Sequence, residues 1–445
     1  MLKILLLLVL FILPHATPLT SLLLPRNSKT LSFRSGLQLI YRKSLPSTLP
    51  TLKTGDLVTI KTVPNADGNF DWVGLGVYNE DSMYAVRILE HWNGRVFKEL
   101  VSAEFDDKEI ISKIFTARLL SSITSKSHLN LPSPSTDSYR LLNGEGSSLS
   151  GFSLDVYGPN LAVAMSSAAY VEMYKDTILE CCENILGHSN VIWKNTPTRL
   201  KQDGYNILEP TSEVDLPPSS PTPERTIIQE NSILYTLNPS SQKTGFYTDQ
   251  RENRALISSL SSGKRVLDLC CYVGGFSLNA AKNGGAVECV GVDSSSDAIE
   301  GARENAVLND VTNCEFVQSS IEGYMKKAIE NGEEYDIVIL DPPKLAPTLK
   351  GLDRASRKYH ALNRDALKLI DRKNGGLLLT CTCSSAMSTK DGGEFFLRMI
   401  QRASLSAGRE VKLCGRSYSS WCHVTGLLEG GSNYLTAALI EVEGE

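Results

Sequence analysis

The sequence predicts an α/β protein of several domains whose C-terminal part is built on a parallel β-sheet. Short apolar runs of β type recur at Arg265–Leu269, Glu288–Val292, Tyr335–Leu340 and Gly376–Thr380, with helix-like patterns between them. Alternation of strands and helices is typical of parallel sheets. Glycines, carboxylates or thiols follow these runs, and the length of 445 residues favours two or three domains.

The N-terminal segment, residues 1–45, is expected to be a targeting or transit segment. Residues 1–55 contain no Asp or Glu, but seven Lys or Arg residues among many Ser, Thr and Leu, which is typical of a transit peptide. The apolar run Ile4–Leu13 is short for a membrane span. All ten cysteines follow residue 180, without disulfide or zinc-ligand spacing. We expect the plastid (chloroplast) stroma, with the mitochondrion as the alternative, no stable membrane association and no metal site.

Two domains are expected between this segment and the parallel sheet. Residues 46–102 predict a small β-barrel, because apolar and polar residues alternate from Gly55 to His91 with Asn, Asp and Gly turns between the runs. Residues 103–237 predict an α+β middle domain, with a helical pattern at Lys108–Ser125. A linker rich in Pro and Ser, Leu216–Pro223, interrupts that domain.

The turn after the first strand of the C-terminal domain, residues 238–445, indicates a nucleotide site. Gly274 and Gly275 let the backbone approach a ligand closely, and the following helix would present its N-terminus. About twenty residues further on, Asp293 ends the next strand, where an acidic residue accepts hydrogen bonds from ribose hydroxyls. The turn lacks the G-x-G-x-x-G pattern of dinucleotide sites, so S-adenosylmethionine fits better than NAD.

Two polar motifs end the later strands. Asp341-Pro342-Pro343-Lys344 follows one apolar run, and Thr380-Cys381-Thr382-Cys383-Ser384 ends the other. The carboxyl ends of parallel strands meet at one rim of a sheet, where ligands bind in α/β folds. A carboxylate and a thiol at this rim suggest chemistry on a planar substrate, with the thiol as a nucleophile.

Several ordered motifs carry a family resemblance. They include Gln242–Arg254 (QKTGFYTDQRENR), Arg140–Gly158, Asp341–Lys344 and Cys383–Ser384, together with the glycine turn and its following aspartate. From about Ser138 to the C-terminus the chain resembles the bacterial 23S rRNA cytosine-C5 methyltransferases. That family has an N-terminal PUA domain, an RNA-binding module, and a C-terminal class I (Rossmann-like) catalytic domain that uses S-adenosylmethionine. The resemblance implies a PUA-like barrel, an RNA-binding middle domain and large-subunit rRNA as the partner.

The resemblance also implies particular site residues. Cofactor contacts are expected from Phe246, Gln250, Arg251, Asp268, Tyr272, Gly274, Gly275, Phe276, Asp293, Ser294, Ser320 and Asp341. Separately from the resemblance, basic and aromatic residues cluster at and beyond the Asp-Pro-Pro motif, and contacts with RNA are expected from Lys344, Arg357, Lys358 and Tyr359. The sequence departs from the family at Ser319-Ser320, where the family has an acidic residue that contacts adenine.

The implied mechanism forms 5-methylcytosine through a covalent adduct. The Cys383 thiolate would add to cytosine C6, and Asp341 would bind the N3 and exocyclic amine edge. The thiol acts only as thiolate, so a positive field must lower its pKa. Cys381 is expected to be a buried strand residue. The target base must leave its stack to reach this rim, which favours single-stranded or extruded cytosine.

Two other functions stay open. A guanine N-methyltransferase would share Asp-Pro-Pro but needs no cysteine, although Lys344 replaces the aromatic residue that such enzymes place after that motif. A catalytically silent RNA-binding or ribosome-assembly factor could keep the fold. The net charge of -5 argues against a broad basic surface and favours selective RNA recognition. The oligomeric state is open, with a homodimer as one alternative.

Overall fold

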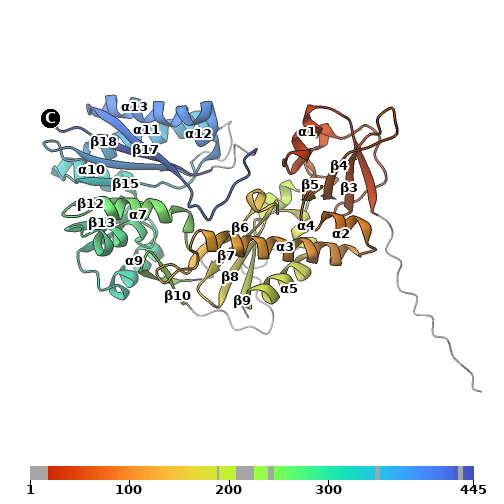
Figure 1. Ribbon diagram of the computed structural model, residues 1–445. Helices are drawn as coiled ribbons and strands as arrows, with labels where there is room; N and C mark the ends of the chain where they lie inside the picture. Colours follow the sequence, from red (N-terminus) through yellow and green to blue (C-terminus); the bar gives the residue numbers. More distant parts are fainter. Residues whose placement is uncertain (1–18, 188–189, 207–224, 239–244, 346–350, 429–433) are drawn as a thin grey trace, which may run out of the picture.

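The computed structural model describes residues 19–187, 190–206, 225–238, 245–345, 351–428 and 434–445 (Figure 1). The linker Leu216–Pro223 and the first three residues of the motif Gln242–Arg254 lie outside these ranges. Among the residues that the structure describes, no helix combines the length and apolar character that a bilayer span requires.

The N-terminal domain is a five-stranded sheet with two helices. Its elements are β1 (Thr20–Leu24), α1 (Ser28–Arg34), β2 (Leu39–Tyr41), β3 (Leu57–Thr62), β4 (Trp72–Tyr78), β5 (Tyr84–His91) and α2 (Phe97–Ser102). The strand order is β1-β3-β4-β5-β2, with β1 parallel to β3 and the other pairs antiparallel. The predicted β-structure is therefore confirmed.

The predicted boundary between a targeting segment and this domain, at residues 45 and 46, is wrong. Strand β1 pairs with β3 along its whole length, and β2 pairs with β5. Leu22, Leu24 and Ile40 from these early strands are fully or almost fully buried in the domain core. The basic, acid-free composition of this stretch belongs to a folded domain. Residues 1–18 lie outside the described residues.

The middle domain follows through a long helix. Its elements are α3 (Asp107–His128), β6 (Ser138–Asn143), η2 (Gly144–Ser147), β7 (Phe152–Tyr157), β8 (Leu161–Ser166), α4 (Ala169–Met173), α5 (Lys175–Leu186), β9 (Asn190–Asn195) and α6 (Pro197–Gln202). Helix α3 starts at a capping box in which Asp106 and Glu109 bind each other's backbone N–H groups. It confirms the predicted helix at Lys108–Ser125. The sheet order is β6-β7-β8-β9.

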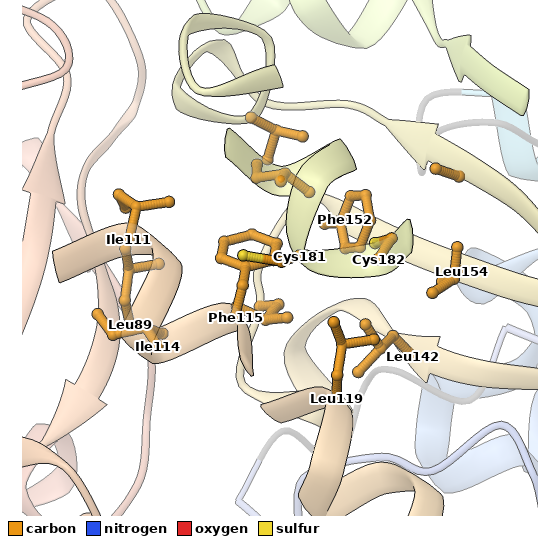
Figure 2. Close-up of a cluster of buried hydrophobic side chains, with 14 of the residues drawn as sticks. Leu89, Ile111, Ile114, Phe115, Leu119, Leu142, Phe152, Leu154, Cys181 and Cys182 are labelled. Atoms are coloured by element: carbon orange, nitrogen blue, oxygen red, sulfur yellow. The ribbon is translucent and has the colours of Figure 1, made fainter. Parts of the chain in front are cut away.

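The first two domains share one hydrophobic core. Figure 2 shows Leu89 of β5 on one side of helix α3, which contributes Ile111 and Phe115, while Phe152 of β7 and Cys182 of α5 lie on the other. All of these side chains are fully buried. Burial of apolar surface across the boundary therefore holds the two domains together.

The C-terminal domain is a seven-stranded sheet with helices on both faces (Figure 1). Its elements are η3 (Thr248–Gln250), α7 (Arg251–Leu260), β12 (Arg265–Leu269), α8 (Gly275–Leu278), the π-helix η4 (Asn279–Asn283), β13 (Glu288–Asp293), α9 (Ser296–Leu308), β14 (Cys314–Gln318), α10 (Ile321–Asn331), β15 (Ile337–Leu340), α11 (Leu352–Lys368), β16 (Gly376–Thr382), α12 (Ser385–Thr389), η6 (Lys390–Gly393), α13 (Glu394–Ala407), β17 (Val411–Tyr418) and β18 (Thr436–Val442).

The sheet order places a switch point at the centre of this domain. The order is β14-β13-β12-β15-β16-β18-β17, and every pair from β14 to β16 is parallel. The strands that follow β12 in the sequence, β13 and β14, therefore lie on one side of it, whereas β15 and β16 lie on the other side. Ligands of α/β sheets bind outside the carboxyl ends of the strands at such a point. The predicted parallel sheet is confirmed.

The hairpin that ends the predicted middle domain is bonded to both neighbouring domains. Strands β10 (Thr226–Glu230) and β11 (Ile233–Leu237) form a two-stranded antiparallel sheet. The Leu234 N–H donates to Asn309 Oδ1 at 2.9 Å, and the Thr236 N–H donates to Asn305 Oδ1 at 2.8 Å. These bonds attach the hairpin to α9 and its C-terminal end. The Gln229 N–H also donates to Asp137 Oδ1 of the middle domain at 2.7 Å, so the boundary between residues 237 and 238 stays a prediction.

Candidate active site

The predicted carboxylate and thiol lie at the same rim of the sheet. In the parallel register, Leu269 of β12 is opposite Leu340 of β15, and Leu340 is opposite Thr380 of β16. Asp341 follows β15 directly, and Cys383 follows β16 directly. The Cys383 Sγ lies 3.9 Å from the carbonyl oxygen of Pro342. The meeting of the two motifs that the sequence predicted is therefore confirmed.

The Asp341 carboxyl group is held by a chain of amide side chains. Gln250 Nε2 donates to Asp341 Oδ2 at 2.9 Å, and Asn253 Nδ2 donates to Gln250 Oε1 at 2.6 Å. Burial raises the pKa of Asp341 to about 7, and the nearby Asp249 carboxylate adds to this rise. Near neutral pH the group is thus present in both protonation states. It can donate a proton to a bound group or accept a hydrogen bond from it.

The two cysteines of the second motif have different surroundings. Cys381 is fully buried inside β16, where burial and the Asp341 carboxylate raise its pKa well above the usual value. Cys383 lies just beyond the strand end and is partly exposed. Only Cys383 can present its sulfur to a substrate, and the expectation that Cys381 is a buried strand residue is confirmed.

Asp293 ends β13 beside the glycine turn. Its Oδ2 accepts the Tyr272 N–H at 3.0 Å, and its Oδ1 accepts the Ser295 N–H at 2.9 Å. These bonds fix the carboxylate while the residue stays partly exposed. Each carboxylate oxygen has two lone pairs, so acceptor capacity remains for a diol.

Asp268 provides a second acceptor at the end of β12. Its Oδ2 accepts the backbone N–H and the hydroxyl of Ser277 at 3.1 and 2.8 Å. Its Oδ1 is buried and has no hydrogen-bond partner among the described residues. Burial raises the pKa of Asp268 to about 6. Buried polar atoms are normally paired, so this oxygen fits a ligand with a donor group.

The two predicted glycines are needed for packing inside the protein. Gly274 has φ +82° at the start of α8, a left-handed conformation that favours glycine. A Cβ at Gly275 would lie 2.6 Å from Arg254 Nε. Arg254 forms a buried ion pair with Glu230 at 2.5 Å. Close approach of a ligand is therefore not needed to explain Gly275.

Phe246 and Phe276 pack against other side chains of the domain. The Arg254 guanidinium lies 4.8 Å from the Phe246 ring centroid and 5.9 Å from that of Phe276. Phe246 also packs on Tyr235, with ring centroids 4.7 Å apart. Both side chains are buried, and their predicted contacts with the cofactor stay predictions.

Arg251 is also a structural residue. It is buried, donates to Ser420 Oγ at 2.6 Å and pairs with Glu252 at 3.1 Å. Its charge is thus paired inside the protein, and the predicted cofactor contact stays a prediction. Ser320 caps α10, because its hydroxyl accepts the Gly323 N–H at 3.2 Å. Ser294 is exposed next to Asp293. Cofactor contacts of these two serines stay predictions.

One of the four predicted RNA contacts is wrong. Tyr359 is fully buried in the core, and its hydroxyl lies 3.0 Å from Thr382 Oγ1. Lys344, Arg357 and Lys358 are exposed, and Lys358 pairs with Glu322 at 3.2 Å. Contacts of these three cations with RNA stay predictions.

Sequence reasoning missed two groups at the site. Tyr434, which precedes β18, donates from its hydroxyl to Asp249 Oδ2 at 2.5 Å. Asp249 is next in sequence to Gln250 and lies close enough to Asp341 to raise its pKa. Asp249 stands within the motif that carried the resemblance, but no spacing pattern links it with a tyrosine 185 positions away.

The fold and the rim define a class I methyltransferase. A family model described as a methyltransferase domain matches residues 260–425, and one described as a PUA-like domain matches residues 26–91. A solved structure from Streptococcus mutans, assigned as a SAM-dependent methyltransferase, has a TM-score of 0.73 and 20% identity over 95% of this chain and all of that chain. This likeness establishes the fold.

Curated relatives identify the family. Ribosomal RNA large subunit methyltransferase I of Photobacterium profundum is 32% identical over 359 residues, which span 80% of this chain and 84% of the relative. The protein of the same name from Aeromonas hydrophila is 31% identical over 359 residues, 79% of this chain and 86% of the relative. The chain therefore belongs to the ribosomal RNA large subunit methyltransferase I family.

Proposed function

We propose that the protein transfers a methyl group from S-adenosylmethionine to C5 of a cytosine in large-subunit ribosomal RNA. The observation that carries this proposal is the partly exposed Cys383 thiol beside the Asp341-Pro342 turn at the rim of the sheet. Methylation of an amino group would not require a thiol there. The names of the relatives support ribosomal RNA as the substrate.

Two carboxylates fit the proposed cofactor. Asp293 would hold the ribose hydroxyls, because its fixed carboxylate keeps free acceptor capacity at the end of β13. The unpartnered Asp268 Oδ1 would accept from the amino group. When bound, S-adenosylmethionine supplies an electrophilic methyl group. A structure of the same fold with a TM-score of 0.73, assigned as a methyltransferase, holds SAH, which supports this choice.

The Cys383 thiolate would act at C6 of the cytosine ring, and the Asp341 carboxyl group would act at the opposite edge, around N3. Cytosine C5 is a poor nucleophile until the Cys383 thiolate adds to C6. As that bond forms, negative charge moves toward N3, where protonated Asp341 would donate its proton and its other oxygen would accept from the exocyclic amine. C5 then attacks the methyl group. Loss of the C5 proton to a base expels the thiolate, and N3 returns its proton to Asp341, which restores the cytosine ring.

A methylation assay tests the proposal. Purified protein would be incubated with S-adenosylmethionine and unmodified large-subunit rRNA, and the digested nucleosides measured by mass spectrometry. We expect 5-methylcytosine from the wild-type protein and from Cys414→Ala, because Cys414 is exposed on β17 and away from the rim. Methylguanine in place of 5-methylcytosine would overturn the proposal in favour of N-methylation. Loss of cofactor binding would favour a silent RNA-binding factor.

We also propose that the protein reaches an organelle, with the plastid stroma first and the mitochondrion as the alternative. Residues 20–45 form part of the folded PUA-like domain, so the targeting information would lie within residues 1–18. The apolar run Ile4–Leu13 is inside that segment. The absence of disulfides among the described cysteines supports a reducing compartment.

A further inference from the structure

A cavity of about 520 Å³ lies where the three domains meet. The PUA-like domain contributes Tyr84 and Arg87 to its wall, the middle domain contributes Arg199 of α6, and the methyltransferase domain contributes Thr425 and Tyr434. This volume is within the range of sites that hold small molecules or nucleotides. None of the roles described above uses this cavity.

Of the three arginines in the cavity wall, two are paired with carboxylates and one can bind a ligand. Arg87 pairs with Asp203 at 2.6 Å, and both side chains are buried. Arg140 pairs with Asp155 at 2.5 Å. Arg199 is exposed and has no ion pair among the described residues. A guanidinium group in this state can form bidentate hydrogen bonds with a phosphate.

Aromatic and polar groups complete the wall. The Tyr84 ring lies 5.1 Å from that of Tyr41, and Met83 next to it is 60% exposed. Aromatic side chains of this kind give nucleic-acid bases a surface to stack on. The remaining carboxylate of the wall, Glu145, accepts from Ser150 Oγ at 2.7 Å and is held back by that bond.

Two hydrogen bonds connect the cavity with the active site. Tyr434, on the cavity wall, donates to Asp249 Oδ2, and the next residue, Gln250, donates to Asp341 Oδ2. The cavity wall and the Asp341 carboxyl group are therefore linked through Tyr434, Asp249 and Gln250. A nucleotide that neighbours the target cytosine in the RNA is therefore the candidate occupant of the cavity.

We propose that this cavity binds an unpaired nucleotide next to the target cytosine, with its phosphate on Arg199 and its base against Tyr84. The identity of the target rests on the function proposed above, whereas binding of an unpaired nucleotide does not. The site would hold the strand in register while the cytosine is extruded, so that all three domains act on one RNA segment.

Binding measurements separate the phosphate contact from the stacking contact. For Arg199→Ala we expect weaker binding of single-stranded target RNA and a slope of log K against log salt that is smaller by about 0.7, the value for one phosphate on a single strand. Tyr84→Leu should weaken binding by about tenfold with the slope unchanged. Matched controls are Arg402→Ala, an exposed arginine on α13 that has no ion pair within the described part of the chain, and Tyr418→Leu, an exposed tyrosine on β17. Both controls should bind as the wild type does.

Crosslinking locates the nucleotide. RNA with 4-thiouridine beside the target cytosine should crosslink to peptides that contain Met83-Tyr84 or α6. The inference would be overturned if both cavity variants bound RNA with the affinity and salt slope of the wild type and the crosslinks formed elsewhere. This would hold even if the protein forms 5-methylcytosine. If the variants and the crosslinks behaved as expected but no 5-methylcytosine formed, binding of a nucleotide in the cavity would be supported and the proposed function would be overturned.

Discussion

At the scale of single residues, Asp341 has an unusual combination of contacts. It accepts a hydrogen bond from Gln250, but burial and Asp249 keep its pKa near 7. A carboxylic acid with this pKa can give a proton to cytosine N3 near neutral pH, which an ordinary aspartate cannot do. The same position at the rim brings it beside the Cys383 thiol.

This pKa predicts a pH dependence of methyl transfer. The protonated form of Asp341 predominates below its pKa of about 7, so its contribution to kcat/KM should fall as pH rises through 7. Asp341→Asn keeps an acceptor for Gln250 but cannot transfer a proton. We expect kcat to fall by about 100-fold in this variant, within the usual range for general acid catalysis, and the limb near pH 7 to disappear. If the fall of kcat/KM near pH 7 persisted in Asp341→Asn, another group would be responsible for it.

A second residue-scale prediction concerns Asp293. Asp293→Ala should weaken S-adenosylmethionine binding by about 2 to 4 kcal/mol, because charged hydrogen bonds contribute roughly 1.5 to 3 kcal/mol each with incomplete additivity. Asp297→Ala is the matched control, an exposed aspartate in the first turn of α9. Calorimetry measures both affinities. Equal affinity in the two folded variants would remove Asp293 from the cofactor site.

At the scale of elements, the segment after β17 joins the methyltransferase domain to the middle domain. Lys126 Nζ of α3 donates to the Cys422 carbonyl oxygen at 2.8 Å, and Asn143 Nδ2 donates to that of Val424 at 2.9 Å. A Cβ at Gly146 would lie only 1.8 Å from the Val424 carbonyl oxygen. The absence of a side chain at Gly146 thus permits this contact, which forms one wall of the cavity.

Gly146→Ala should disturb this contact. Overpacking of this kind costs about 1 to 3 kcal/mol, so we expect a lower Tm and faster proteolysis after β17. Gly415→Ala is the control, because a Cβ there meets nothing within 4 Å. Equal Tm values and equal cleavage for the two variants would show that the segment adapts without cost.

At the scale of the whole molecule, the PUA-like and middle domains behave as one packed unit. Helix α3 buries side chains against both sheets, as Figure 2 shows for Ile111 and Phe115. Strands β1 and β2 complete the first sheet. Cleavage after residue 45 would remove both strands together with their buried side chains Leu22, Leu24 and Ile40.

The position of the targeting information can be tested with two fusions. We expect residues 1–18 fused to a fluorescent protein to reach the same organelle as residues 1–55, and the mature N-terminus found by mass spectrometry to precede Thr20. If residues 1–55 delivered the fluorescent protein and residues 1–18 did not, the targeting signal would extend into the folded domain. Fluorescence in the secretory pathway would contradict the organelle proposal.

The sequence predicted the sheet and its reactive rim because these depend on local patterns. Apolar runs and the residues after them place Asp341 and Cys383 beyond neighbouring strands. It assigned Tyr359 wrongly, because a residue type in a motif does not reveal whether the side chain is already buried against a partner. It also missed β1 and Tyr434, because a parallel pairing with β3 and a hydrogen bond across 185 positions leave no local pattern.

Covalent trapping tests the central claim, that Cys383 is the nucleophile, most directly. RNA with 5-azacytosine at the target has no C5 proton to release, so the enzyme cannot expel its thiolate after methyl transfer. The account predicts an adduct that survives denaturing electrophoresis and maps by peptide mass to Cys383. The adduct should be absent in Cys383→Ala and present in Cys381→Ala. An adduct that maps to Cys381, or full methyl transfer by Cys383→Ala, would contradict the account.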